Sequence, residues 1–560
     1  MFKKYSIVIK QKERVELSAG RWLVVAVVSS WCWALLAPSL GVAHRLHLCG
    51  NQPVLYSPMG IKAALSRPLA AYTLHRYRQW QRNPVATQLA LLRELVRTAG
   101  PTAFGQAHGF AGIHTAADFA ARVPIRDYEA LKPYFDRVKA GEPGILWPGR
   151  PLYLAKTSGT TSGAKYIPIT QASIGNHING AKDALLHYVA ATGRSRFLDG
   201  KLIFLSGSPE LERLGGIPTG RLSGIVNHHV PAYLRRNQLP SYATNCLDDW
   251  ETKLDAIVAE TLGQNMTLIS GIPPWVQMYF DRLTARTGRP VGEVFPEFDL
   301  FVSGGVSMEP YRARLLESIG RQVDSIELFP ASEGFLAFQD QPGNPGLLLR
   351  LASGIFFEFV PAERFFEDNP PRLTIAEVEL DKQYAVVLTS NAGLWAYSLG
   401  DTVRFVDLHP HRVVVTGRIK HFLSAFGEHV IGEEVEAALR EAVRQHPETE
   451  VTEFTVAPLV SDDPRQPSRH EWLVEFAQLP RDAASFAAAL DRALRQRNTY
   501  YDDLRQGNIL VPLLLTPLLA GAFQRYMKSV GKLGGQNKVP RLGNDRGLAE
   551  GLLTASAGIN

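Results

Sequence analysis

Cysteine is scarce in this sequence. Of three cysteines in 560 residues, Cys32 and Cys49 lie within the first 58 positions, which leaves Cys246 for the rest of the chain. A disulfide framework or a thiolate metal cluster needs several cysteines close together. We therefore expect neither in the body of the chain, which fits a reducing, cytoplasmic environment.

The body also lacks a surplus of positive charge. The formal net charge is +6, but residues 1–58 contain seven basic and two acidic side chains, so the remainder is close to neutral. Proteins that bind nucleic acid neutralise many phosphates with Lys and Arg. Nucleic acid is therefore not expected as a partner.

One long apolar run occurs, at residues 22–43, and it carries no charged side chain. It is long enough to span a bilayer, and its end weakly resembles a signal cleavage site. A membrane anchor, a signal peptide and an extension from a start codon assigned too early are the three interpretations. The positive-inside rule would place residues 1–21 in the cytosol and the body of the chain outside it, whereas Met59 opens a more ordinary beginning. The extension is therefore preferred, and a membrane partner is not expected.

The chain is too long for one hydrophobic core, so at least two domains are expected. Short apolar segments alternate with helical patterns, which predicts an α/β fold with β-sheets flanked by helices. The expected strands are 152–155, 202–205, 268–269, 300–302, 386–388 and 413–415, and the expected helices include 87–98, 250–261 and 311–319.

After residue 417 the pattern changes. A Glu-rich amphipathic helix at 433–443, a strand at 451–457 and a helix at 483–495 predict a smaller α+β domain. The predicted organisation is an extension over residues 1–58, a large N-terminal domain over 59–416 and a C-terminal domain over 417–560.

Residues 157–165 read Thr-Ser-Gly-Thr-Thr-Ser-Gly-Ala-Lys and directly follow an expected strand. Small residues and the hydroxyls of Ser158, Thr160 and Thr161 let backbone N–H groups surround phosphate oxygens, while Lys165 supplies positive charge. A flexible Ser/Thr/Gly linker is the alternative. The lysine and the apolar segment that follows it favour a phosphate-binding loop.

Four further segments contain residues suited to nucleotide chemistry. In Phe329-Pro-Ala-Ser332-Glu333-Gly, the carboxylate suits Mg²⁺ and the aromatic ring suits a purine. Asp401 follows a glycine and suits the hydroxyls of a ribose. Arg418 also follows a glycine, and Lys538 lies in a Gly-rich loop. Each segment alone is equally compatible with an ordinary turn or a solvated side chain.

Together, in this order and spacing, the five segments resemble the adenylate-forming (acyl-CoA synthetase / firefly luciferase-like) superfamily. Within it the chain resembles the bacterial branch of the Gretchen Hagen (auxin-responsive promoter) family of acyl-acid amido synthetases. Supporting segments are Gly-Ile-Pro-Pro-Trp at 271–275, Val-Ser-Gly-Gly-Val at 302–306 and Asn-Ala-Gly-Leu-Trp at 391–395. The resemblance covers residues 59–546.

The resemblance implies a large domain for ATP and acid and a mobile C-terminal domain. By position, Ser158, Thr160, Thr161 and Lys165 would contact phosphates, Glu333 would hold Mg²⁺, and Phe329 and Ser332 would lie at the nucleotide. Asp401 would bind the ribose, Arg418 would act at the hinge, and Lys538 would stabilise charge. Two departures are Ser398, where the family has arginine, and Phe329, where tyrosine is common.

The implied function is an ATP-dependent ligase that joins a small carboxylic acid to the amine of an amino acid. The expected state is a monomer in the cytoplasm. An acyl-CoA ligase, with a thiol acceptor, is the alternative. A membrane-anchored binding protein would make residues 1–58 the functional part. The sequence does not identify the acid, the amino acid or a general base.

Expression of residues 59–560 alone tests the role of the N-terminal segment. If residues 1–58 are an extension, the shorter chain stays in solution and retains the full activity of the whole chain. Loss of activity on removal of residues 1–58, restored by returning them, would instead support an anchor.

Overall fold

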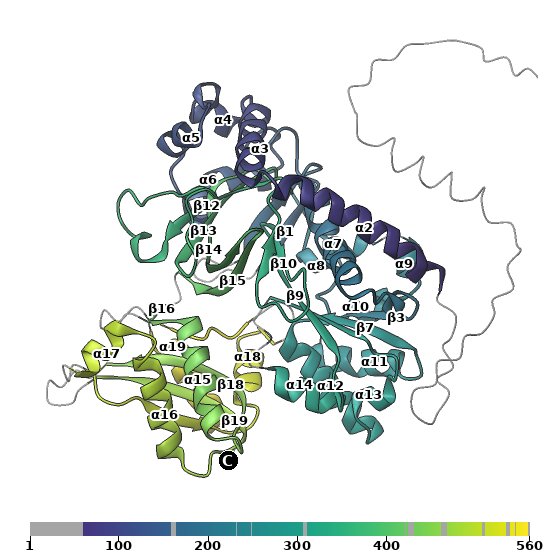
Figure 1. Cartoon of the computed structure of the whole chain (residues 1–560), viewed down its shortest axis with the longest axis vertical. Coiled ribbons are helices and arrows are strands. Elements are labelled where there is room, and N and C mark those ends of the chain that lie inside the picture. Colours follow the sequence, from purple (N-terminus) through teal and green to yellow (C-terminus); the bar gives the residue numbers. More distant parts are fainter. Residues whose placement is uncertain are drawn as a thin grey trace, which may run out of the picture. The chain divides into compact units, whose positions relative to one another are not determined.

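The computed structural model describes most of residues 60–557 and identifies 59–560 as one compact unit (Figure 1). The described residues are 60–157, 164–230, 232–247, 249–305, 308, 311–419, 422–423, 430–460, 468–506, 510–533, 538–543 and 545–557. The apolar run at 22–43 lies outside them. Among the described residues, no helix combines the length and apolar character needed to cross a membrane.

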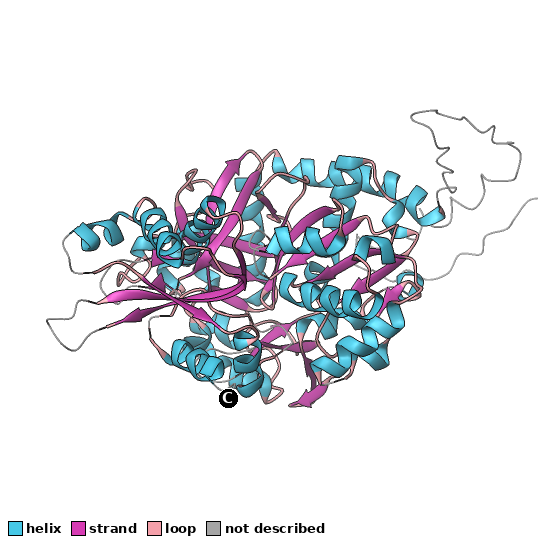
Figure 2. Cartoon of the chain, turned by 90° about the horizontal axis from the view of Figure 1, so that it is seen from below, coloured by secondary structure: helices cyan, strands magenta, loops and turns pink. Residues whose placement is uncertain are grey.

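The largest sheet has eleven strands among the described residues, and one half of it is parallel. This half contains, in spatial order, β6 (Gln238–Leu239), β3 (Lys201–Phe204), β7 (Met266–Gly271), β8 (Leu300–Gly304) and β9 (Asp324–Ala331). The intervening helices are α11 (Trp250–Thr261), α12 (Pro273–Thr287), α13 (Val291–Val294) and α14 (Arg312–Ile319). They lie beside β7 in Figure 1, and Figure 2 shows helices flanking the strands from below. Parallel strands end at the same edge of a sheet, so the segments after β3, β7 and β8 are neighbours.

The other half of this sheet is antiparallel. Its strands are β10 (Gly334–Phe338), β11 (Leu347–Leu349), β15 (His411–Arg418), β14 (Leu394–Leu408), β13 (Gln383–Ser390) and β12 (Ile355–Pro361). Most side chains of β12 and β13 are buried, so both faces of these strands are covered. The expected α/β architecture is confirmed, with a mixed rather than a parallel sheet.

A second sheet holds the expected phosphate-binding segment. Its strand order is β2 (Lys165–Ile169), β1 (Tyr153–Thr157), β5 (Ile217–Gly220) and β4 (Glu212–Leu214). α6 (Tyr128–Lys139) packs against β2, and α8 (Leu222–His228) packs against β1. The other helices of the N-terminal part are α2 (Ile61–Gln81), α3 (Pro84–Ala99), α4 (Ala103–Ala107), α5 (Ala116–Arg122), α7 (Ile174–Thr192), α9 (Ala232–Arg235) and α10 (Tyr242–Asn245). The strand expected at 152–155 and the helix expected at 87–98 are confirmed as β1 and α3.

The C-terminal part has its own sheet, β18 (Glu450–Leu459), β19 (Arg469–Gln478) and β20 (Leu514–Leu518). Its other elements are β16 (Phe422–Leu423), β17 (Val430–Ile431), α15 (Gly432–Gln445), α16 (Ala483–Arg495), α17 (Thr499–Gln506), α18 (Ala522–Ser529) and α19 (Gly547–Ala557). Trp472, Val474 and Leu490 are fully buried in a core separate from that of the large sheet. The expected smaller α+β domain is confirmed.

Glu434 in the first turn of α15 gives the C-terminal part a pH-dependent stability. Its carboxylate accepts hydrogen bonds from the Ile431 N–H and the Asn498 side chain, both at 3.0 Å. Burial nevertheless raises the pKa of Glu434 to about 7. A raised pKa in the folded state stabilises the fold fully below the unfolded pKa and loses this contribution as pH rises through about 7.

We therefore predict that Glu434→Gln, which retains an acceptor oxygen without the charge, raises the melting temperature at pH 8 by a few degrees and leaves it unchanged at pH 5. Glu441→Gln on the same helix is the matched control, because Arg444 and Gln445 lower the pKa of Glu441 to about 2, outside this range. Equal pH profiles for wild type and Glu434→Gln would contradict the prediction.

Candidate active site

Asp401 and Arg418, from two separate sequence motifs, face each other across β14 and β15. They are direct partners in the antiparallel register, and Arg418 Nε donates to Asp401 Oδ1 at 2.7 Å. The negative charge of Asp401 raises the pKa of the Arg418 guanidinium. Both remain partly accessible, with 48% of the Arg418 side chain and 14% of the Asp401 side chain exposed.

Asp401 lies within β14 rather than at either end of the strand. Between Ala385 and Val387 of β13, the register on β14 shifts by extra residues, which forms a bulge containing Asp401. Gly400 in this bulge has φ +84°, a backbone conformation that favours glycine. The bulge thus sets the position of the aspartate.

Glu333 lies in the two-residue turn between β9 and β10. Ala331 pairs with Gly334, so Ser332 and Glu333 form the connection. A Cβ atom at Gly334 would lie 2.5 Å from Ile355 Cδ1, so a larger residue here would have to displace the end of that side chain. The turn predicted around Glu333 is therefore a hairpin fixed against the core.

Tyr397 forms a hydrogen bond with the Glu333 carboxylate. Its hydroxyl donates to Glu333 Oε1 at 3.2 Å. Burial raises the pKa of Glu333, while the positive charge of Lys165 lowers it. Burial, and then the Glu333 charge, raise the pKa of Tyr397 well above its usual value, so its hydroxyl stays a neutral donor.

Lys165 is the first residue of β2 and pairs with Thr157, the last residue of β1. The segment between them is therefore a hairpin connection. Lys165 Nζ lies 5.8 Å from the centre of the Tyr128 ring, whose hydroxyl accepts from the Tyr166 N–H at 3.1 Å. The Lys165 ammonium is therefore within cation–π distance of the Tyr128 ring. Ser158, Thr160 and Thr161 lie outside the described residues.

Lys538 reaches the site from the C-terminal part. A Cβ atom at Gly305, just after β8, would lie 3.4 Å from Lys538 Cε and 3.6 Å from Ile272 Cγ1. Gly305 has φ +89°. Burial lowers the pKa of the Lys538 ammonium, with an opposing effect from Asp401 and a further lowering by Arg418. The side chain nevertheless remains accessible to solvent.

The structure therefore gathers charged groups from five separate motifs. The charges of Lys165, Asp401 and Arg418 act on the pKa of Glu333. The charges of Asp401 and Arg418 also act on the pKa of Lys538. Three cations and two carboxylates suit an anion that brings a cation with it. This is the charge pattern of a polyphosphate bound with a divalent metal.

A magnesium ion fits Glu333 as one ligand among phosphate oxygens and water. Mg²⁺ in such sites is commonly bound by one or two carboxylates plus substrate phosphates. The described residues contain no group of three or more His, Cys, Asp or Glu side chains that could hold a metal ion. Glu333 has a raised pKa, so protons compete with a cation for its carboxylate.

Two residues of the site were not assigned a role from the sequence. Tyr397 precedes Asp401 by four positions, yet its partner Glu333 lies 64 residues before Tyr397. Tyr128 lies outside every motif. Phe329 is 9% exposed and packs in the main core, so its observed role is packing, and purine stacking stays a prediction.

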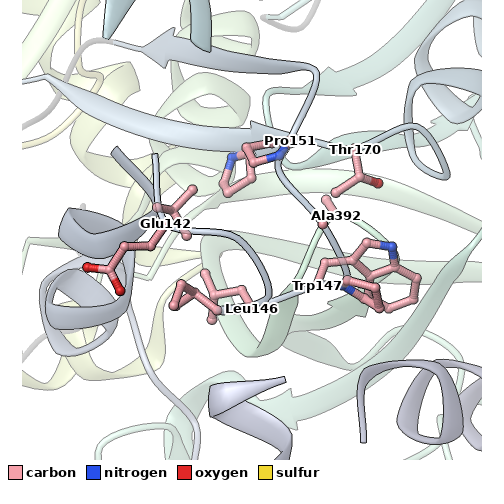
Figure 3. Close-up of a pocket in the computed structure, with 11 residues that line it drawn as sticks. Glu142, Leu146, Trp147, Pro151, Thr170 and Ala392 are labelled. Atoms are coloured by element: carbon pink, nitrogen blue, oxygen red, sulfur yellow. The ribbon is translucent and has the colours of Figure 1, made fainter. Parts of the chain in front are cut away.

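A shallow depression with a cavity volume of about 10 Å³ lies elsewhere, lined by Leu146, Trp147 and Ala392 among others (Figure 3). Two of its polar side chains already have partners: Thr170 donates to the Asn391 carbonyl at 2.6 Å, and Glu142 accepts from Arg137 at 2.9 Å. It adjoins the end of β2 opposite Lys165. A volume of this size holds about one water molecule and not a substrate.

Models of one known protein family match three segments of the chain. The GH3 family N-terminal domain matches residues 73–246, the GH3 family central domain 348–418 and the GH3 family C-terminal domain 433–547. Jasmonoyl–L-amino acid synthetase GH3.5 of Oryza sativa subsp. japonica is 30% identical over 267 residues, which are 42% of this chain and 44% of the rice protein. The match thus spans less than half of that relative.

Longer matches connect other proteins to the chain. Jasmonoyl–L-amino acid synthetase JAR6 of Nicotiana attenuata is 22% identical over 80% of this chain and 89% of its own length. The structure of GH3.15 acyl acid amido synthetase has a TM-score of 0.71 at 17% identity, covering 89% of this chain and 97% of that one. A 2-hydroxyisobutyryl-CoA ligase reaches 0.53 at 14% identity, covering 83% and 91%.

These two likenesses show that the chain shares the fold of GH3.15 acyl acid amido synthetase and of the 2-hydroxyisobutyryl-CoA ligase. The three domain models belong to one family and match the chain in order, and their matches together cover more than half of it. The chain belongs to the GH3 family.

Proposed function

We propose that this protein is an ATP-dependent acyl-acid amido synthetase. It activates a small carboxylic acid as an acyl-adenylate and then transfers the acyl group to an amino acid. The observation that carries this proposal is the convergence of Lys165, Glu333, Asp401, Arg418 and Lys538, from five motifs, at one accessible place. The relatives named as amino acid synthetases support the same reaction.

The first step consumes ATP. An oxygen of the substrate carboxylate attacks the α-phosphorus, and the bond to the departing pyrophosphate breaks. Lys165 and Lys538 stabilise the negative charge that develops on the phosphate oxygens. Mg²⁺, held by Glu333 with phosphate oxygens, would supply further positive charge.

The nucleotide is held by the pair at β14 and β15. Asp401 accepts hydrogen bonds from the ribose hydroxyls, and Arg418 keeps its carboxylate oriented through the 2.7 Å hydrogen bond. Ser158, Thr160 and Thr161 contact phosphates from the β1–β2 connection, and Ser332 and Phe329 lie beside the nucleotide. These roles follow the family motifs that the residues occupy.

In the second step the amine of an amino acid attacks the acyl carbon. The bond to AMP breaks, AMP leaves, and the amine loses its proton to solvent.

The domain organisation that we propose has an N-terminal domain over 59–416 and a mobile C-terminal domain over 417–560. We further propose a bacterial branch of the family, a cytoplasmic location and a monomeric state, as the sequence predicts.

Pyrophosphate release tests the proposed reaction. With ATP, Mg²⁺ and a panel of carboxylic acids, we expect pyrophosphate only with some acids, and an amide product once amino acids are added. Absence of acid-dependent pyrophosphate across the panel would reject adenylation. A requirement for coenzyme A, with no amide formed, would instead identify an acyl-CoA ligase.

Substitution of the charged groups tests their roles. Lys165→Ala and Asp401→Ala should each lower the rate of acid-dependent pyrophosphate release by about a hundredfold, the size typical of removing one preorganised charge-stabilising group. Lys132→Ala is the matched control, since Lys132 lies on the surface in an ion pair with Asp136. Wild-type rates in both site variants would exclude these residues from the reaction.

A further inference from the structure

Arg541 follows Lys538 by three positions and is fixed to the C-terminal sheet. The Thr455 hydroxyl donates to the Pro540 carbonyl at 2.8 Å, and the Val456 N–H donates to the Arg541 carbonyl at 3.0 Å. These hydrogen bonds attach the segment carrying Arg541 to β18. The position of Arg541 and that of Lys538 are therefore linked through a short, anchored stretch of backbone.

The Arg541 side chain forms a closed ring of hydrogen bonds with Tyr311 and Glu453. Arg541 Nη2 donates to the Tyr311 hydroxyl at 2.7 Å, and that hydroxyl donates to Glu453 Oε2 at 3.1 Å. Arg541 Nη1 completes the ring by pairing with Glu453 Oε1. Tyr311 precedes α14 in the N-terminal part, whereas Arg541 and Glu453 belong to the C-terminal part.

This ring is sheltered from solvent. The Arg541 and Glu453 side chains are 14% and 12% exposed, and Glu436, a second carboxylate 3.2 Å from Arg541 Nε, is 19% exposed. The guanidinium also lies 4.7 Å from the centre of the Phe454 ring. Exposed ion pairs contribute little, but sheltered, charge-assisted hydrogen bonds are stronger.

Two nearby polar contacts between the two parts are longer, whereas the ion pair between Arg404 of β14 and Glu433 of α15 is 2.9 Å long. Arg314 Nη1 lies 3.5 Å from Thr452 Oγ1, and Lys528 Nζ lies 3.9 Å from Glu251 Oε1. The Tyr311 hydroxyl makes two shorter bonds, and burial raises its pKa so that it stays protonated. It is therefore well suited to fix where the C-terminal segment docks.

We propose that Tyr311 and Arg541 are positioning residues that seat Lys538 in the active site for the adenylation step. This inference rests on the proposed function. Neither residue needs to touch ATP or the acid. They act by holding the segment that contains Lys538 against the N-terminal part, where the lysine side chain lies beside Gly305.

The test separates the two half-reactions in the full-length chain. Tyr311→Phe keeps the ring but removes both hydrogen bonds of the hydroxyl. We expect acid-dependent pyrophosphate release to fall about tenfold, the effect of losing a charge-assisted hydrogen bond. Transfer from a chemically prepared acyl-adenylate to an amino acid should stay at the wild-type rate.

A double variant tests whether Tyr311 acts through Lys538. If it does, Tyr311→Phe combined with Lys538→Ala releases pyrophosphate no more slowly than Lys538→Ala alone. Arg541→Lys, which keeps the charge but loses the forked geometry, should reproduce the Tyr311→Phe pattern. Tyr279→Phe is the matched control, because it removes a buried hydroxyl bonded to Thr261 within the N-terminal part.

The outcomes separate this inference from the proposed function. No pyrophosphate from the wild-type chain with any acid would reject the function itself. An active wild type, a slow Lys538→Ala and an unaffected Tyr311→Phe would overturn the positioning role. Equal losses in both half-reactions, or losses that multiply in the double variant, would also overturn it, because they would indicate general destabilisation.

Discussion

The antiparallel pairing of β14 with β15 is the constraint on which the site depends. Its register places Asp401 opposite Arg418, and the chain continues from β15 into the C-terminal part. On its other edge β14 pairs with β13, and the same strand carries Tyr397 to Glu333. A register shift of one residue would turn each of these side chains to the opposite face. Strand pairing therefore positions these side chains and the start of the C-terminal part together.

The glycines around the site serve this geometry in different ways. Gly400 allows the bulge that carries Asp401, because its φ is positive. Gly334 allows close packing, since Ile355 occupies the space that a side chain would need. Gly305 combines a positive φ with contact to Lys538. Glycines thus help to position the charged residues. Because glycine has no side chain, several cations and carboxylates can approach each other on rigid strands.

The sequence predicted helices and strands that have strong periodicity, but it did not predict contacts between distant segments. The helix expected at 483–495 is α16 with the same bounds, and the strand expected at 386–388 is the centre of β13. The α/β fold and the charged motif residues were also predictable. The bond from Tyr397 to Glu333 was not, because no local pattern specifies which strands become neighbours. Likewise, the approach of Lys538 to Gly305 depends on how the C-terminal part packs, which propensity and patterning do not determine.

The uneven distribution of charge has a consequence for how a nucleotide arrives. The body outside residues 1–58 is nearly neutral, yet its site places three cations beside two carboxylates. A polyanion far from the molecule therefore experiences little attraction from the body. Attraction grows only within about 8–10 Å, the screening length at physiological salt. Encounter with ATP is thus governed by a short-range local field, and ionic strength acts on the final approach rather than on long-range diffusion.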